Sequence, residues 1–198
     1  RPTEMQKIRA LFTEKPWRFL WHAVRYVSPD GVRRAVTAVQ IWRALRERRS
    51  FYDAHAVEPA MDRPFVYLPL HFQPEASTVP MGGVFADQVL IARMLNALLP
   101  DNVLIYVKEH PRESAWVSRS IGDYCDLLAL KKVRLIARTV DTFLLRERCS
   151  AVATVTGTAG FEALFRGKPV LLFGYRFYQY AQGVFRIRTV EECAHAVQ

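Results

Sequence analysis

The chain has 198 residues, of which 51% are apolar and 24% charged, and it carries a formal net charge of +9. This composition is typical of a globular protein and excludes disordered, collagen-like and disulfide-scaffold chains. No apolar run reaches the ~18 residues that a membrane-spanning helix needs. Three cysteines without a C-x-x-C spacing indicate a reducing compartment rather than a disulfide framework. Because the chain begins with Arg1 and shows no signal peptide, we expect it to be part of a longer protein.

Positive charge is concentrated near the N-terminus, where residues 1–50 hold 12 Lys and Arg against 4 Asp and Glu, a net charge of +8. Three helices are predicted in this segment, over residues 3–14, 16–27 and 29–50. Ser28 is the predicted N-cap of the third helix. A solvated basic helix face is one interpretation of this segment, and contact with an anionic membrane surface is another.

The sequence pattern changes near residue 64, and residues 51–63 are predicted to be a linker. Five apolar strands are predicted, over residues 65–70, 103–107, 133–137, 151–155 and 170–173. Helices are predicted over residues 83–99, 114–130, 141–148 and 158–166, and from about residue 189 to the end. Apolar strands that alternate with helices predict an α/β fold, a Rossmann-like doubly wound parallel sheet. We therefore expect two parts: a basic helical segment with its linker (1–63) and a Rossmann-like domain (64–198).

Ligands of such sheets bind beyond the carboxyl ends of the strands, so polar residues there are site candidates. A long polar loop begins at His71, after the first strand, and a surface turn is its alternative interpretation. The second strand is followed by Lys108-Glu109-His110-Pro111. His110 could donate a hydrogen bond to a phosphate or protonate a leaving group, although many histidines are simply satisfied polar residues.

The junction after the fourth strand is the most informative, because small residues and hydroxyls precede a helix there. Thr156, Gly157 and Thr158 can offer backbone N–H groups and hydroxyls to an anion. Glu162 lies one helical turn after Thr158, where its carboxylate could accept hydrogen bonds from a ribose. Simple helix capping with an exposed Glu162 is the alternative.

Several common motifs are absent from the sequence. There is no Walker A sequence and no G-x-G-x-x-G fingerprint, which argues against a P-loop ATPase and an ordinary NAD enzyme. There is no Asp-x-Asp and no His/Cys spacing typical of a metal site. We therefore expect no metal and no other cofactor.

Three blocks of the sequence together resemble the capsule polysaccharide biosynthesis proteins: PLHFQPEASTVPMGGVFADQ (69–88), VKEHP (107–111) and TVTGTAGFEALFRGKPVLLFG (154–174). That family includes bacterial transferases of 3-deoxy-octulosonic acid (Kdo) from a CMP-activated donor. It is similar to GT-B glycosyltransferases, in which two Rossmann-like domains face each other across a cleft and the C-terminal one holds the nucleotide sugar, usually without a metal. The resemblance covers residues 64–180, and most of an acceptor-binding domain is absent.

The resemblance also implies residue roles. His110 and Pro111 match an HP motif that contacts the CMP phosphate, and His110 would also be catalytic. Thr156, Gly157 and Thr158 match the phosphate loop of the family. Glu162 matches the Glu before GKPV, which faces the ribose or the sugar. The first-strand loop, near the donor sugar or the acceptor, contains His71, Gln73, Pro74 and the candidate catalytic carboxylate Glu75.

The resulting prediction is a metal-independent glycosyltransferase fragment that binds CMP-Kdo and uses a glycolipid or polysaccharide acceptor. We expect it in the cytoplasm, at the inner membrane face, with peripheral contact through residues 1–50. The isolated fragment could be inactive. A UDP-sugar transferase or epimerase is the first alternative. A non-enzymatic basic module that binds protein or nucleic acid is the second, and nucleic acid is disfavoured because no recognition-helix or RNP-like motif is present.

Overall fold

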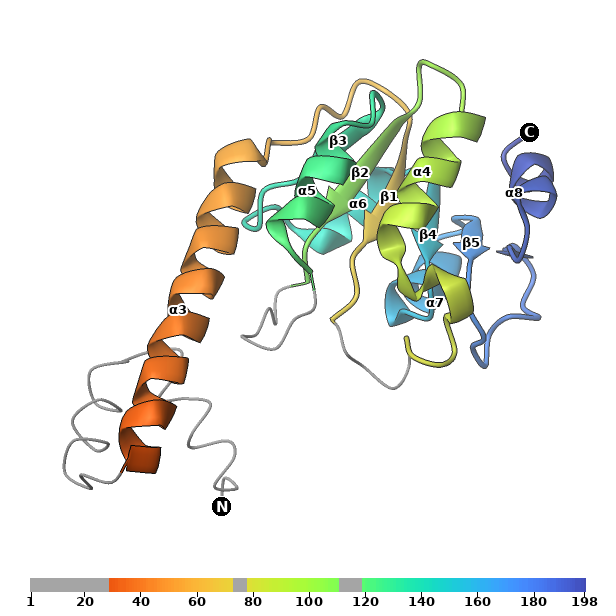
Figure 1. Cartoon of the computed structure of the whole chain (residues 1–198). Helices are drawn as coiled ribbons and strands as arrows, with labels where there is room; N and C mark the ends of the chain where they lie inside the picture. Colours follow the sequence, from red (N-terminus) through yellow and green to blue (C-terminus); the bar gives the residue numbers. More distant parts are fainter. Residues whose placement is uncertain (1–28, 73–77, 111–118) are drawn as a thin grey trace. The chain divides into compact units, whose positions relative to one another are not determined.

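The computed structural model describes residues 29–72, 78–110 and 119–198 (Figure 1). The chain forms two compact units, residues 1–51 and 52–198. Helix α3 (Pro29–His55) begins in the first unit and ends in the second. The helix predicted over residues 29–50 is therefore present, but it continues through residues 51–55, which the sequence pattern assigned to a linker. The helices predicted over residues 3–14 and 16–27, and Ser28, lie outside the described residues.

The second unit contains a sheet of six parallel strands. Their bounds are β1 (Phe65–Pro69), β2 (Leu104–Lys108), β3 (Val133–Leu135), β4 (Ala151–Thr154), β5 (Val170–Leu172) and β6 (Val184–Arg186). The strand order β3-β2-β1-β4-β5-β6 is that of a doubly wound Rossmann-like sheet, which confirms the predicted fold class. β6 was not predicted, because this edge strand is mostly exposed and lacks a run of buried apolar residues.

Helices cover both faces of the sheet (Figure 1). They are α4 (Gln88–Leu98), α5 (Ile121–Leu128), α6 (Thr142–Arg148), α7 (Thr158–Leu164) and α8 (Val190–Ala196). α4 packs against α5 and α8 on one face, and α6 packs against α7 on the other. Strands β1, β2, β4 and β5 are buried on both sides, as their largely apolar sequences indicate. Among the described residues, no helix is both long and apolar enough to cross a bilayer.

The helix predicted over residues 83–99 is in fact two pieces. A short 3-10 helix, η1 (Gly83–Ala86), comes first, and α4 begins after Asp87. Asp87 has an extended backbone, and its carboxylate accepts a hydrogen bond from the Val89 N–H at 3.0 Å. Asp87 is thus the N-cap of α4, and its extended backbone is what separates the two helices.

The starts of α5, α6 and α8 also have side-chain caps, and Thr189 is the cap of α8. Asp141 caps α6 as predicted, since its carboxylate accepts from the Phe143 N–H at 2.8 Å. Ser120 and Asp123 form a capping box at the start of α5. This box begins the helix at Ile121, which shortens the helix predicted over residues 114–130; residues 114–118 lie outside the described residues.

The sheet order creates a divergence between β1 and β4. The chain moves outward from β1 to β2 and β3 on one side, and from β4 to β5 and β6 on the other. The connections at the carboxyl ends of β1 and β4 therefore lead away in opposite directions and leave a crevice between them. Most of the candidate residues identified from the sequence follow the strands that end at this crevice.

Candidate functional site

A cavity of about 290 Å³ lies beyond the carboxyl ends of β1, β2 and β4. Residues from all three strand ends line it, together with residues from α6 and from the segment after β5. The lining residues are Tyr67, Pro69, Leu70, His71, Phe72, Lys108, Glu109, His110, Thr142, Arg146, Thr156, Gly157, Thr158, Ala159 and Arg176. The cavity is thus at the switch point of the sheet.

His71, after β1, is buried and held at both its backbone and its ring. Its N–H donates to the Gln88 carboxamide oxygen at 2.7 Å, and its carbonyl accepts from Arg119 at 2.7 Å. Its ring Nε2 accepts from the Val155 N–H at 3.3 Å, which requires a neutral ring with the proton on Nδ1. Burial lowers the pKa of His71 to about 4, and the nearby charges of Arg119, His110 and Arg176 act in the same direction.

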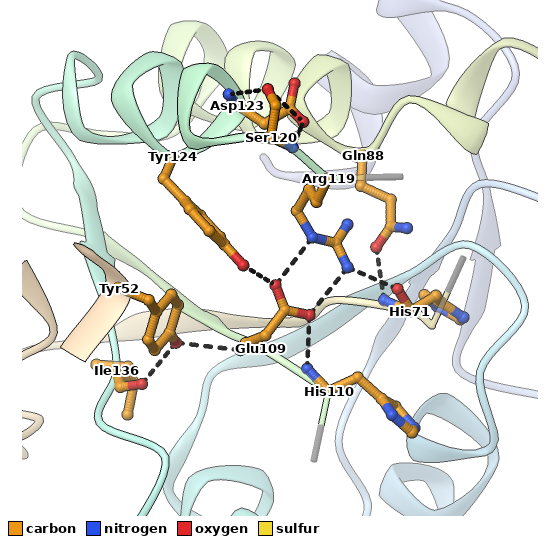
Figure 2. A network of polar contacts seen from close by, with 10 residues as sticks. All are labelled: Tyr52, His71, Gln88, Glu109, His110, Arg119, Ser120, Asp123, Tyr124 and Ile136. Carbon is orange, nitrogen blue, oxygen red and sulfur yellow. Dashed lines mark hydrogen bonds and ion pairs between the residues drawn. The ribbon is translucent and has the colours of Figure 1, made fainter. Parts of the chain in front are cut away.

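Glu109, after β2, is at the centre of a buried polar network (Figure 2). Its carboxylate accepts from Arg119 Nε at 2.9 Å and Nη2 at 3.0 Å, from the Tyr124 hydroxyl at 2.6 Å and from the His110 N–H at 2.8 Å. Burial alone would raise the pKa of Glu109, but the Arg119 charge and these hydrogen bonds hold the pKa below its ordinary value. Glu109 is therefore ionised, and both of its oxygens are occupied.

The loop after β4 approaches His71 closely. The Gly157 N–H donates to the Thr154 hydroxyl at 3.0 Å, and the Gly157 carbonyl accepts from the Tyr178 hydroxyl at 2.5 Å. A Cβ on Gly157 would lie 2.8 Å from Thr154 Oγ1 and 2.9 Å from His71 Cε1. Only glycine fits this close approach.

Two residues of the cavity lining each have a buried polar atom without a partner in the described part of the chain. Thr156 is 1% exposed, and its hydroxyl has no hydrogen-bond partner among the described residues. The Nε of Arg176 is also buried without an acceptor among them. Buried polar groups are rarely left unpaired, and both of these residues line the same cavity.

The cavity has an excess of cationic side chains. Lys108, Arg146 and Arg176 line it, whereas Glu109 is the single carboxylate in the described part of the lining and is neutralised by Arg119. Lys108 is buried and donates to the Val140 carbonyl, and burial lowers its pKa. This charge balance favours an anionic ligand.

Most of the described candidate residues meet at the cavity: His71, His110, Thr156, Gly157 and Thr158 line it. Glu162 is absent from this lining, and its carboxylate lies 3.0 Å from Arg146. The remaining candidates, Gln73, Pro74, Glu75 and Pro111, lie outside the described residues.

Sequence reasoning missed three cationic residues of the lining. Lys108 precedes the singled-out His110 by two positions, and Arg176 follows the fifth strand, whose end was recognised as a ligand position. Arg146 lies inside a predicted helix and gave no comparable signal. Within the described ranges, no group of three or more His, Cys, Asp or Glu residues is placed to hold a metal ion.

The fold and the cavity define a Rossmann-like α/β domain with a crevice lined by cationic side chains at its switch point. The model of the capsule polysaccharide biosynthesis protein family matches residues 23–196, and the chain belongs to this family. This confirms the resemblance found in the sequence. No curated protein matches the chain.

Among solved structures, the chain is similar to a Thermosulfurimonas dismutans KpsC described as a beta Kdo 2,7 transferase. The TM-score is 0.51 at 20% identity, over 80% of this chain and 52% of that one. A beta Kdo 2,4 transferase KpsC of the same organism has a TM-score of 0.47 at 22% identity, over 80% and 54%. A Methanocaldococcus jannaschii UDP-GlcNAc 2-epimerase has a TM-score of 0.46 at 12% identity, over 79% and 44%. The first likeness supports the fold, and the chain spans about half the length of these proteins.

Proposed function

We propose that the chain is the nucleotide-sugar-binding part of a glycosyltransferase of capsular or surface polysaccharide biosynthesis. The observation that carries this proposal is a cationic cavity at the switch point whose lining includes Thr156 and Arg176, two residues with a buried polar atom that has no partner within the described ranges. Membership of the capsule polysaccharide biosynthesis family supports the biological setting. Within this proposal, CMP-Kdo is the donor and a glycolipid or a polysaccharide is the acceptor.

The chemistry of sugar transfer makes use of such a cavity. When the bond between the sugar and the phosphate breaks, negative charge develops on the nucleotide phosphate. Thr156 and Arg176 would donate hydrogen bonds to that phosphate, and His110 would stabilise or protonate the leaving group. These groups are already held in a buried site, so little reorganisation is required during the reaction.

A carboxylate that activates the acceptor must come from another position than Glu109. The Glu109 oxygens accept four hydrogen bonds and are not available as a base. Glu75 remains our candidate for the catalytic carboxylate, with Gln73 and Pro74 beside the donor sugar or the acceptor. Glu162, which pairs with Arg146, would orient that cation toward the ribose or the sugar.

Residues 1–50 would contact the anionic cytoplasmic face of the inner membrane, where lipid-linked acceptors are found. The net charge of +8 and the three Trp of this segment support the proposal. Cosedimentation of the chain with anionic but not with zwitterionic vesicles is the expected result. Equal binding to both vesicle types would contradict it.

Calorimetric titration of the chain with CMP and UMP tests the proposed function. We expect CMP to bind more tightly than UMP, and Arg176→Gln to weaken CMP binding about tenfold through the loss of a charged hydrogen bond. Arg93→Gln is the control, since Arg93 forms an exposed ion pair with Asp126 outside the cavity lining. A preference for UMP would favour a UDP-sugar enzyme, and no binding of either nucleotide at millimolar concentration would overturn the proposal.

A further inference from the structure

We propose that Glu109, Arg119, His71 and Thr154 form a positioning relay, which holds the ends of β1, β2 and β4 in register around the cavity. The proposal deepens the proposed function and rests on it for the ligand. It assigns these side chains to the geometry of the site and not to contact with the reacting atoms.

The first half of the relay joins β2 to β1 (Figure 2). Glu109 holds the backbone N–H of His110 at 2.8 Å and the guanidinium of Arg119 at 2.9 and 3.0 Å. Arg119 in turn donates to the carbonyl of His71 at 2.7 Å. The side chains of Glu109 and Arg119 are 1% and 5% exposed, respectively, so water does not compete for these bonds.

The second half joins β1 to β4. The Thr154 hydroxyl accepts from the Gly157 N–H, so its own proton is free to be donated to His71 Nε2, 2.9 Å away. The same Nε2 accepts from the Val155 N–H. His71 thus contacts Val155 directly before Thr156, and it reaches Gly157 directly after Thr156 through the Thr154 hydroxyl. The Thr156 hydroxyl itself has no partner among the described residues.

The backbone hydrogen bonds of the sheet do not connect the ends of β1 and β4. The register between β1 and β4 ends at the pair Tyr67 and Val152, four residues before His71. Past that point the two strand ends diverge, as the switch point requires. Side chains must then hold the loops together, and the relay spans this gap.

The competing explanation is that Glu109 and Arg119 form an ion pair that affects only the stability of the fold. Buried salt bridges do not in general position other groups. The two explanations differ in what they predict for His71. In the relay, the state of the His71 ring and the placement of the loop at Gly157 depend on Arg119. In the competing explanation, only the free energy of unfolding depends on it.

Histidine side-chain NMR of the ¹⁵N-labelled wild-type chain and of Arg119→Lys tests the relay without any ligand, because only the relay predicts that the ring signals of His71 shift in the variant. The expected result is a neutral His71 with the proton on Nδ1 and an unprotonated Nε2. Protonation of Nε2 in the native protein would overturn the proposal. This outcome is independent of nucleotide binding, so failure of the relay is distinguishable from failure of the proposed function.

Arg119→Lys tests the connection, because an ammonium keeps the charge but loses the planar fork that bonds Glu109 and His71 together. We expect the amide signals of His110 and Gly157 to shift and the CMP affinity to fall about tenfold. Leu95→Ala is the control: Leu95 is buried in α4 away from the cavity lining, so stability should fall while the affinity and these two signals stay unchanged.

Glu109→Gln is the second variant, in case Arg119→Lys does not fold. It removes the charge and replaces one acceptor oxygen with a donor, which leaves Arg119 and the His110 N–H competing for the other oxygen. Shifts of the His110 and Gly157 amides would support the relay. Unchanged signals together with an unchanged CMP affinity would overturn it.

Discussion

His71 shows how the surroundings of a residue decide its chemistry. A histidine at a strand end could act as an acid, a base or a ligand-binding group. In the structure it is buried, neutral and engaged at Nε2, so its ring cannot take up a proton without loss of the hydrogen bond from Val155. At this site His71 is better suited to hold a loop than to transfer a proton.

The pKa of His71 makes stability depend on pH. The unfolded chain takes up a proton below the ordinary pKa of 6.5, whereas native His71 stays neutral down to about 4. The contribution of His71 to the free energy of unfolding is therefore fully present above pH 6.5 and decreases as the pH falls toward 4. We expect about 2 kcal/mol less stability from this group at about pH 5 than at about pH 7.

Urea unfolding of the wild type and His71→Asn at both pH values measures this contribution. The difference in unfolding free energy between the two proteins should shrink as the pH is lowered, because the variant lacks the titrating ring. A constant difference across this pH range would show that His71 titrates normally in the native state.

Thr156→Val should separate binding from stability. The substitution removes a buried hydroxyl that has no partner among the described residues, so the free energy of unfolding should stay the same or increase by about 1 kcal/mol. CMP affinity should nevertheless fall. Thr154→Val is the matched control, which we expect to lose about 1–3 kcal/mol because the bonds to Gly157 and His71 are broken. Equal losses of stability in both variants would contradict this prediction.

Among the elements, α7 shows that small residues serve more than one purpose. Thr156, Gly157 and Thr158 were interpreted together as an anion site, in a stretch of small residues that continues to Gly160. Gly160 has a packing role instead: a Cβ there would lie 2.8 Å from the Tyr178 hydroxyl and 2.9 Å from Thr154 Cγ2. Glycine thus allows this helix to pack closely against β4 and the segment after β5.

Gly160→Ala should destabilise the protein although alanine favours helices. The gain in helix propensity is about 1 kcal/mol, whereas overpacking against Tyr178 and Thr154 costs about 1–3 kcal/mol. A net loss is expected in urea unfolding, together with weaker CMP binding because Gly157 is bonded to the same Tyr178. A more stable variant would contradict the packing role.

At the scale of the whole molecule, the two units should respond differently to salt. The cationic groups of the cavity are largely buried, and the charges of residues 1–50 are proposed to act at a membrane surface. Surface electrostatics are screened over about 10 Å at ~0.1 M salt, and buried pairs are screened much less.

Vesicle binding and CMP affinity measured across a salt series test this difference. Between about 0.05 and 0.5 M salt, binding to anionic vesicles should be lost, while the CMP affinity changes only a few-fold. Parallel losses in both measurements would show that nucleotide binding is a surface charge effect.

The sequence alone predicted the parallel sheet, five of its strands and five of the residues that line the cavity: His71, His110, Thr156, Gly157 and Thr158. It could do so because apolar strands, capping residues such as Asp141 and strand-end motifs such as Lys108-Glu109-His110 are local signals. The missed strand β6 lacks a strong local signal, because it is a mostly exposed edge strand. The break at Asp87 has a local signal, an N-cap residue that accepts from the Val89 N–H, but this signal was not recognised.

Only the tertiary structure could show that Arg119 bonds Glu109 and His71 and that Arg146 and Arg176 reach the cavity. These contacts join residues far apart in the chain, so no local pattern encodes them. The sequence determined where the strand ends lie, and the packing of the chain decided which side chains meet there. The physical reason is that burial and hydrogen bonding depend on neighbours in space, whereas periodicity and capping depend on neighbours along the chain.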